Sequence, residues 1–169
     1  MPLDDQNEQF YWVNKDDNVI DIISRAEAHS SSMKIHRSVG IFIENHKEEM
    51  LLQQRSVHKD VDPSMWSYSV SGHVAAGQSY RQTAIKEVFE EIGLKIKNLT
   101  FLGKYLIKTE KEREVTTFYK TKITSPKIKL DMTEVEKVTW IKISDLPKFV
   151  EENAFTLWSL KALKLTGLL

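Results

Sequence analysis

One segment, residues 72–94, constrains the fold of this chain more than any other part of its sequence. Within it, Glu87, Glu90 and Glu91 are spaced i, i+3 and i+4, which places their carboxylates on one face of a helix. Like charges at this spacing cost an isolated helix about 0.2–0.5 kcal/mol per pair. A solvated acidic face is one interpretation, but the glycines at both ends and the apolar opposite face favour a site for a hard divalent cation. The segment therefore predicts a metal-dependent enzyme that acts on a phosphorylated substrate.

Composition limits the classes of function that remain. The chain has 169 residues, 41% of them hydrophobic and 28% charged, which predicts one globular domain. Its 24 Lys and Arg residues balance 24 Asp and Glu residues, so bulk charge indicates neither a nucleic-acid polymer nor a membrane as partner. The absence of cysteine excludes disulfides and thiolate metal sites. No stretch approaches the roughly 20 apolar residues of a membrane span, so the expected location is the cytoplasm.

Hydrophobic periodicity predicts strands and helices that are interleaved along the chain. Ser79–Ile92 is the clearest helix, because its first residue and Gln82 have capping-box spacing. Val39–Glu44 and Met50–Gln54 are predicted to form a hairpin, and Trp66–Val70 alternates as a half-buried strand would. The remaining predicted strands are Leu99–Ile107, Val115–Ile123 and Val135–Ile141, and the remaining predicted helices are 145–152 and Phe155–Leu165. This pattern predicts an α/β or α+β fold with a mixed sheet.

The 72–94 segment resembles the Nudix box, a pattern of spaced glycines and glutamates that ends in Arg-Glu, an aliphatic residue, any residue, Glu-Glu, any residue, glycine and an aliphatic residue. The residues that match are Gly72, Glu87, Val88, Glu90, Glu91, Gly93 and Leu94. Two positions depart from the pattern: Gln78 replaces its glutamate and Lys86 replaces its arginine. In the family these two positions commonly pair with each other. Here an amide would face an ammonium group, and the two could still form a hydrogen bond. The resemblance implies an α/β/α sandwich with a mixed β-sheet and a loop–helix–loop box. We expect one domain over residues 1–169, with an N-terminal extension at 1–35 and a core at 36–169.

Five other residues could form a second site. His29, His36 and His73 supply imidazoles, and Glu112 and Glu114 share one face of an extended stretch. Such a set is typical of a transition-metal, Mn²⁺ or Mg²⁺ site, although a single histidine is more often structural.

From about Arg25 to Trp158 the chain is also similar to type 1 isopentenyl-diphosphate isomerase, an enzyme with the Nudix fold. The matching pieces are Arg25 with His29, then His36, the run LLQQRSVHKDVDPSMW, SGH at 71–73, Glu112 and Glu114, and AFTLW ending at Trp158. The resemblance implies a metal site at His29, His36, His73, Glu112 and Glu114. It also implies that Arg25, Arg55 and Lys59 hold a diphosphate, although for Lys59 alone a solvated loop is the preferred interpretation.

Ser71 separates the two activities that these resemblances imply. The isomerase has a cysteine as its acid/base residue at this position, and a serine hydroxyl is a poor proton donor or acceptor. The isomerase also has a degenerate box, whereas all three core glutamates are present here. We therefore predict that Glu87, Glu90 and Glu91 bind Mg²⁺ or Mn²⁺ and catalyse hydrolysis of a pyrophosphate bond in a nucleoside diphosphate-linked or similar phosphorylated small molecule.

Three alternatives accompany this prediction. The chain could be an isopentenyl-diphosphate isomerase or a related prenyl-diphosphate enzyme, or a binding module that senses a nucleotide without turnover. Glu134 and Glu136 could supply a base from a neighbouring loop, although a position flanking a strand is preferred for both. A homodimer is a further expectation, because dimers are common among proteins that this chain resembles.

Overall fold

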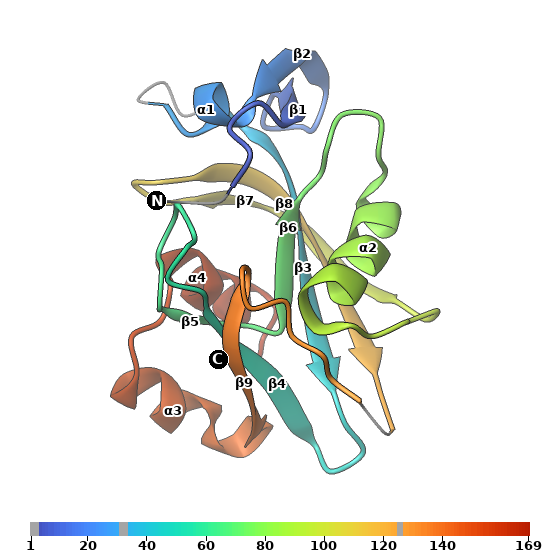
Figure 1. Cartoon of the computed structure of the whole chain (residues 1–169), viewed down its shortest axis with the longest axis vertical. Coiled ribbons are helices and arrows are strands. Elements are labelled where there is room, and N and C mark those ends of the chain that lie inside the picture. The colour runs from blue at the N-terminus through green and yellow to red at the C-terminus, as the bar shows by residue number, and fades with distance from the viewer. Residues whose placement is uncertain (1–3, 31–33, 125–126) are drawn as a thin grey trace.

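The computed structural model describes residues 4–30, 34–124 and 127–169. Within these ranges, a seven-stranded mixed sheet has the order β5-β4-β3-β8-β7, and β6 pairs with β3 while β9 pairs with β4 (Figure 1). The strands of this sheet are β3 (His36–Glu44), β4 (Glu49–Arg55), β5 (Trp66–Ser67), β6 (Val70–His73), β7 (Thr100–Lys108), β8 (Arg113–Lys122) and β9 (Val135–Lys142). The mixed sheet and its interleaved helices confirm the predicted α/β class.

Helices cover both faces of the sheet. Successive side chains of β3 point to opposite faces, and each face packs against a different helix. Ile41 and Ile43 pack toward α2 (Tyr80–Ile92), whereas Phe42 packs toward α4 (Leu157–Leu165). In Figure 1, α2 lies on one side of the sheet, and α3 (Leu146–Glu152), α4 and the short turn η1 (Ile143–Asp145) lie on the other. This layering agrees with the α/β/α sandwich that the resemblance implies.

The predicted hairpin of β3 and β4 is present but minimal. The two strands pair at Glu44 and Met50, after which β4 turns away and pairs with β9 from Glu49 to Arg55. β8 runs parallel to β3 along its length. On the other edge of β3, β6 pairs antiparallel with residues 38–41, with which β4 does not pair. As a result β6 ends beside the start of β3, where the candidate site lies.

The prediction of one half-buried strand over Trp66–Val70 is wrong. The segment divides into β5 and β6, and Ser67 and Ser69 between its aromatic residues are fully buried rather than solvated. The Ser69 hydroxyl donates to the Leu51 carbonyl at 2.6 Å and accepts from the Ile43 N–H at 2.8 Å. A buried serine is tolerated here because its hydroxyl satisfies backbone groups of two neighbouring strands.

The N-terminal residues form a separate layer over one end of the sheet. β1 (Gln9–Val13) and β2 (Val19–Ser24) make a two-stranded antiparallel sheet, which is followed by the short helix α1 (Arg25–Ala28). Phe10 is fully buried and stacks on His36 at 5.4 Å between ring centroids. This packing brings α1, and therefore His29 at its C-terminal end, to the start of β3. In the described part of the chain, none of the helices has the length and apolar content that crossing a membrane needs.

Candidate active site

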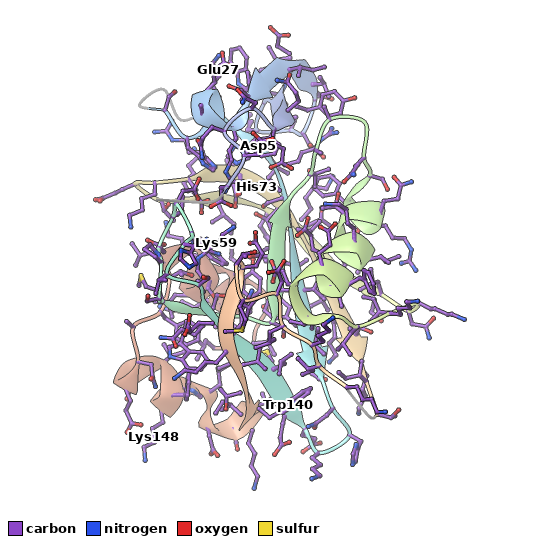
Figure 2. The ribbon with its side chains drawn as sticks, in the orientation of Figure 1. Asp5, Glu27, Lys59, His73, Trp140 and Lys148 are labelled. Carbon is purple, nitrogen blue, oxygen red and sulfur yellow. The ribbon has the colours of Figure 1, made fainter. Side chains whose placement is uncertain are left out.

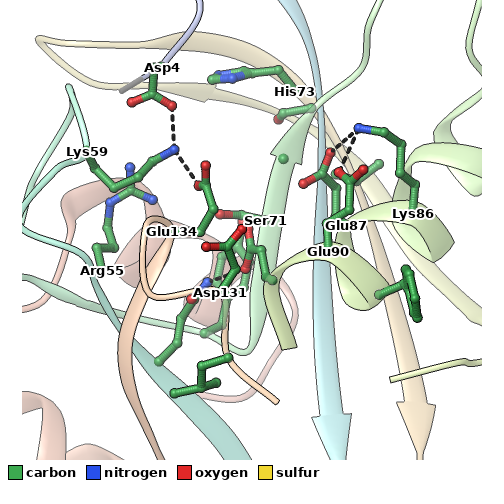
Figure 3. A pocket seen from close by; sticks show the side chains of 18 of the residues that line it. Asp4, Arg55, Lys59, Ser71, His73, Lys86, Glu87, Glu90, Asp131 and Glu134 are labelled. Carbon is green, nitrogen blue, oxygen red and sulfur yellow. Dashed lines mark hydrogen bonds and ion pairs between the residues drawn. The ribbon is translucent and has the colours of Figure 1, made fainter. Parts of the chain in front are cut away.

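A pocket of about 700 Å³ opens between α2, the end of β6 and two loops (Figure 3), and the predicted site residues other than His29 and His36 line it. In the view of Figure 2, His73 and Lys59 lie above Trp140 and Lys148, which are near the lower end of the molecule. Among the residues that line the pocket are nine carboxylates, Asp4, Glu8, Glu87, Glu90, Glu91, Glu112, Glu114, Asp131 and Glu134. Five Lys or Arg side chains face them, Arg25, Arg55, Lys59, Lys86 and Lys129. The pocket therefore concentrates more acidic than basic side chains, although the whole chain is formally neutral.

The start of α2 is set by its own sequence. Ser79 is the N-cap, its hydroxyl accepts from the Gln82 N–H, and the Gln82 side chain accepts from the Ser79 N–H at 3.0 Å. The predicted capping box is thus confirmed, and it fixes the rotation of the helix that carries the glutamates.

The end of α2 is joined to the loop that closes the pocket. Gly93 adopts a left-handed φ of 72°, which favours glycine and stops the helix. The Lys129 and Asp131 N–H groups donate to the carbonyls of Ile92 and Glu91 at 3.0 and 2.9 Å. The 129–134 loop is thereby held beside the carboxylates of the helix.

The three glutamates of α2 occupy different environments. Glu91 is buried and accepts a hydrogen bond from Gln53 Nε2 at 3.0 Å, whereas the side chains of Glu87 and Glu90 are 16% and 50% exposed. Burial raises the pKa of Glu87 to about 7 and raises the pKa of Glu91 well above its usual value, because it removes water from the carboxylates. A Cβ on Gly72 would lie 2.4 Å from Glu87 Cδ, so this glycine leaves the space that the carboxylate occupies.

The two residues that depart from the box pattern do not pair with each other. Gln78 Oε1 accepts from the Thr83 hydroxyl at 3.0 Å. Lys86 Nζ lies 2.8 Å from Glu90 and 3.6 Å from Glu87, as Figure 3 shows. The predicted amide–ammonium hydrogen bond is therefore wrong, because Lys86 turns toward the carboxylates on its own helix. It offsets part of their mutual repulsion.

The structure brings the three histidines and two glutamates of the second predicted site together. His36 at the start of β3 is opposite Glu114 on β8, and His73 ends β6 on the other side of β3. The three imidazole centroids lie 4.9–5.2 Å apart. His73 Nε2 is 2.9 Å from Glu114 and 3.7 Å from Glu112, and His29 Nε2 is 3.9 Å from Glu112.

Electrostatics in this cluster suit a cation. Burial alone lowers the pKa of His73, but hydrogen bonds to Glu112 and Glu114 raise it to about 9. Burial would likewise raise the pKa of Glu114, yet the neighbouring imidazoles of His36 and His73, 3.4 and 2.9 Å away, hold it well below its usual value. Burial lowers the pKa of His29.

Ligand atoms in the cluster are already close enough to share one ion. Among the described residues, two groups of three have ligand atoms within 4.8 Å of one another: His29, His36 and His73, and His73, Glu112 and Glu114. Within the same part of the chain, both ring nitrogens of His29 and Nε2 of His36 are buried without a hydrogen bond. The carboxylates of Asp60, Glu112 and Glu114 lie 3.4–3.9 Å from these nitrogens. Buried imidazole nitrogens that make no hydrogen bond are costly unless a ligand uses them.

Arg25 lines the pocket but is already engaged by carboxylates. Its Nε and Nη2 donate to Asp60 at 3.0 and 3.1 Å, and its Nη1 lies 3.0 Å from His73 Nδ1. Asp4 and Glu8 lie 3.3 and 3.6 Å from the same guanidinium. Arg25 therefore links the N-terminal layer to the histidine cluster.

Lys59 and Arg55 form the opposite wall. Lys59 Nζ donates to Asp4 at 2.5 Å and to Glu134 at 2.7 Å, and its side chain is 12% exposed, so the solvated-loop interpretation of Lys59 is wrong. Arg55 donates twice to the carbonyl of residue 61 and lies over the Trp158 ring at 5.5 Å. All three predicted phosphate-binding cations thus reach the pocket, each with a protein partner.

Several pocket residues escaped the sequence analysis. Asp4 and Gln53 line the pocket but carry no local sequence pattern that marks them. Glu134 was assigned to a strand flank, but it points into the pocket because the 129–134 loop is fastened to α2. Glu136 is exposed on β9, as the preferred interpretation had it.

Comparison with known proteins agrees with this geometry. A family model described as NUDIX domain matches residues 34–160. An isopentenyl-diphosphate Delta-isomerase of Enterobacter sp. (strain 638) is 25% identical over 159 residues, which cover 89% of this chain and 86% of that protein. A prenyl-diphosphate phosphatase of Methanosarcina mazei is 29% identical over 141 residues, which cover 82% of each chain. A crystal structure from Deinococcus radiodurans superposes with a TM-score of 0.74 at 20% identity, over 88% of this chain and 93% of the other.

Proposed function

Because this chain belongs to the NUDIX domain family and is an enzyme of the Nudix pyrophosphohydrolase class, we propose that it hydrolyses a pyrophosphate bond with the help of Mg²⁺ or Mn²⁺. The observation that carries the proposal is the charge of the pocket, in which nine carboxylates face five Lys or Arg side chains. Such a concentration of carboxyl groups favours divalent cations, which can then bridge the pocket to the oxygens of a phosphorylated substrate. Nudix enzymes generally use divalent metals, and their substrates are phosphorylated small molecules.

Two sets of residues fit the proposed cations. The box glutamates Glu87, Glu90 and Glu91 offer oxygen ligands, which Mg²⁺ prefers. The histidine–glutamate cluster supplies a mixed nitrogen and oxygen set suited to Mn²⁺, and its buried nitrogens without hydrogen bonds support that assignment. When bound, such a cation polarises a phosphoryl group and favours ionisation of water.

The protein side chains then have distinct proposed roles. One of the box glutamates Glu87, Glu90 and Glu91 accepts a proton from the attacking water, while the others hold the cation. Arg55 and Lys59 orient the phosphate oxygens from the opposite wall, and Arg25 does so beside the histidine cluster. The buried position of Glu91 keeps one carboxylate oriented toward the pocket through its hydrogen bond to Gln53.

A phosphate-release screen tests this proposal. The panel contains nucleoside di- and triphosphates, dinucleoside polyphosphates, nucleotide sugars, coenzymes and prenyl diphosphates, each with Mg²⁺ and with Mn²⁺. Glu90→Gln and Glu91→Gln should each lower metal-dependent turnover by about 10²-fold or more, since each removes a charged ligand. Glu136→Gln, a matched change on the exposed face of β9, should retain activity. Full activity in both the Glu90 and Glu91 variants would contradict the assignment.

A prenyl diphosphate is the second candidate substrate. The assembled histidine–glutamate cluster and the relatives that are named as an isomerase and as a prenyl-diphosphate phosphatase favour it. Hydrolysis is preferred to isomerisation because Ser71, which lines the pocket, lacks the acidity of a thiol. Ser71→Cys should create or raise isomerase activity if this pocket holds an isopentenyl group. Efficient isomerisation by the unchanged protein would reverse the ranking, and saturable nucleotide binding without any product would favour a sensor.

A further inference from the structure

The N-terminal segment places a carboxylate in the cationic wall of the pocket. Asp4 Oδ1 accepts from Lys59 Nζ at 2.5 Å (Figure 3). Asp4 Oδ2 accepts from the Asp60 N–H at 3.0 Å. Arg25 Nη2 lies 3.3 Å from Asp4 Oδ1. The Asp4 side chain is only 6% exposed, so this carboxylate is enclosed by its partners.

These partners form a site for an oxyanion. Two cationic side chains and one backbone N–H converge on the two oxygens of Asp4, and phosphate oxygens take the same combination of donors. Arg25 and Lys59 are also two of the three residues proposed to hold the substrate phosphates. Asp4 therefore occupies a position that a phosphate group would need.

The segment that carries Asp4 is held by polar contacts. The Arg25 and Ala26 N–H groups donate to the carbonyls of Glu8 and Gln6 at 2.8 and 3.1 Å, which aligns residues 6–8 with the start of α1. Residues 4–9 include no fully buried side chain, and Phe10 is the first residue of the described chain that the core encloses. A stronger anion can thus displace Asp4 without opening the hydrophobic core.

We propose that Asp4 is an internal competitor for substrate phosphate, and that a phosphorylated ligand must displace it from Lys59, Arg25 and the Asp60 N–H. This inference rests on the proposed function, because it assumes that the same cations receive a phosphate. The apparent affinity of a ligand falls by the fraction of protein whose site is open. A charged hydrogen-bonded contact of this kind reduces that fraction by about tenfold.

Binding of methylenebisphosphonate tests the proposal without turnover, because the P–C–P bridge of this diphosphate analogue cannot be hydrolysed. Its affinity is measured by titration calorimetry in excess Mg²⁺ for the unchanged protein, Asp4→Asn and Asp5→Asn. Asp5 is the matched control, since it is the adjacent acidic residue, is exposed, and its carboxylate accepts only the local Asn7 N–H among the contacts of the described chain. Asp4→Asn should bind about tenfold more tightly than the unchanged protein, and Asp5→Asn should bind equally.

Equal or weaker binding by Asp4→Asn would overturn the proposal, and so would the absence of binding by every variant. The thermal midpoint of each variant separates competition from anchoring. If Asp4 were only a structural anchor, its loss would lower the midpoint and leave the affinity unimproved. Where a substrate is known, Asp4→Asn should lower KM and leave kcat within about twofold. If Asp4→Asn bound the analogue more tightly but the protein hydrolysed no substrate, the proposed function would be rejected. Competition between Asp4 and a phosphate group would still be supported.

Discussion

Glu87→Gln should make the metal-free protein more stable at pH 8 while it impairs catalysis. Burial raises the pKa of Glu87 from its ordinary value of 4.5 to about 7 in the folded state. One pKa unit corresponds to about 1.4 kcal/mol, so keeping this carboxylate ionised in the folded protein costs about 3 kcal/mol. Glutamine has almost the same shape and carries no charge, so it avoids this cost.

The pH dependence gives this prediction its sign. Below pH 4.5 the carboxyl is protonated in both states, and the two proteins should have similar unfolding free energies. Between pH 4.5 and pH 7 the unfolded chain releases its proton first, which stabilises the unfolded state and lowers the stability of the unchanged protein. Above pH 7 both states are ionised, so the difference between Glu87→Gln and the unchanged protein reaches its full value.

Urea unfolding in EDTA from pH 4.5 to pH 8.5 measures the effect, and a gain of about 3 kcal/mol corresponds to a rise of about 6–12 °C in thermal midpoint. Glu90→Gln is the control, because its carboxylate is half exposed and its pair with Lys86 contributes at most about 1 kcal/mol. Adding Mg²⁺ should stabilise the unchanged protein more than Glu87→Gln, since the cation binds the ionised form. A stability difference that does not change with pH, or a less stable glutamine variant at pH 8, would refute the reasoning.

Three other predictions follow from individual contacts. Gly72→Ala should lower turnover by about 10²-fold, because its Cβ would stand 2.4 Å from Glu87 Cδ and displace that carboxylate; initial rates at saturating substrate measure this. His36→Asn should weaken Mn²⁺ binding by about 10–100-fold in calorimetric titration, and unchanged affinity would remove His36 from the metal site. Asp17→Asn should lower the unfolding free energy at pH 7 by about 1–3 kcal/mol, since Asp17 accepts from Arg37, Tyr80 and Lys104. Although burial alone would raise the pKa of Asp17, these partners lower it below 3.8, so the difference should shrink as pH falls through that range.

Local chemistry explains which parts of the fold the sequence could predict. The limits of α2 follow from Ser79, Gln82 and Gly93, which act on neighbouring backbone groups. The alternation of Trp66–Val70 led to a wrong strand prediction because the environment of its serines is not set by neighbouring residues. Whether a serine such as Ser69 faces water or the backbone of another strand depends on partners far away in the chain.

The same distinction applies to the candidate site. The box glutamates are recognisable because their spacing is local, whereas the histidine–glutamate cluster exists only because β3 aligns His36 with Glu114 on β8 and Ser38 with His73 on β6. Residue types could mark these residues as candidate ligands, and the resemblance to the isomerase could assign them to one site. Neither predicts which strands pair or in which register. Asp4 has no such signal, since one acidic residue near the start of a chain is ordinary.

Charge balance connects the two proposed ligand sets and the N-terminal segment. Of the five cations in the pocket, Arg25, Lys59 and Lys86 already contact carboxylates, so they are not free to offset an incoming diphosphate. Two like charges 4 Å apart repel by about 4 kcal/mol at an effective dielectric of 20. On the proposed function, a diphosphate therefore enters favourably once divalent cations have neutralised the glutamates and Asp4 has released Lys59. Cation binding and release of the N-terminal segment are then parts of one electrostatic requirement. This requirement explains how a pocket proposed to bind phosphate can hold more acidic than basic side chains.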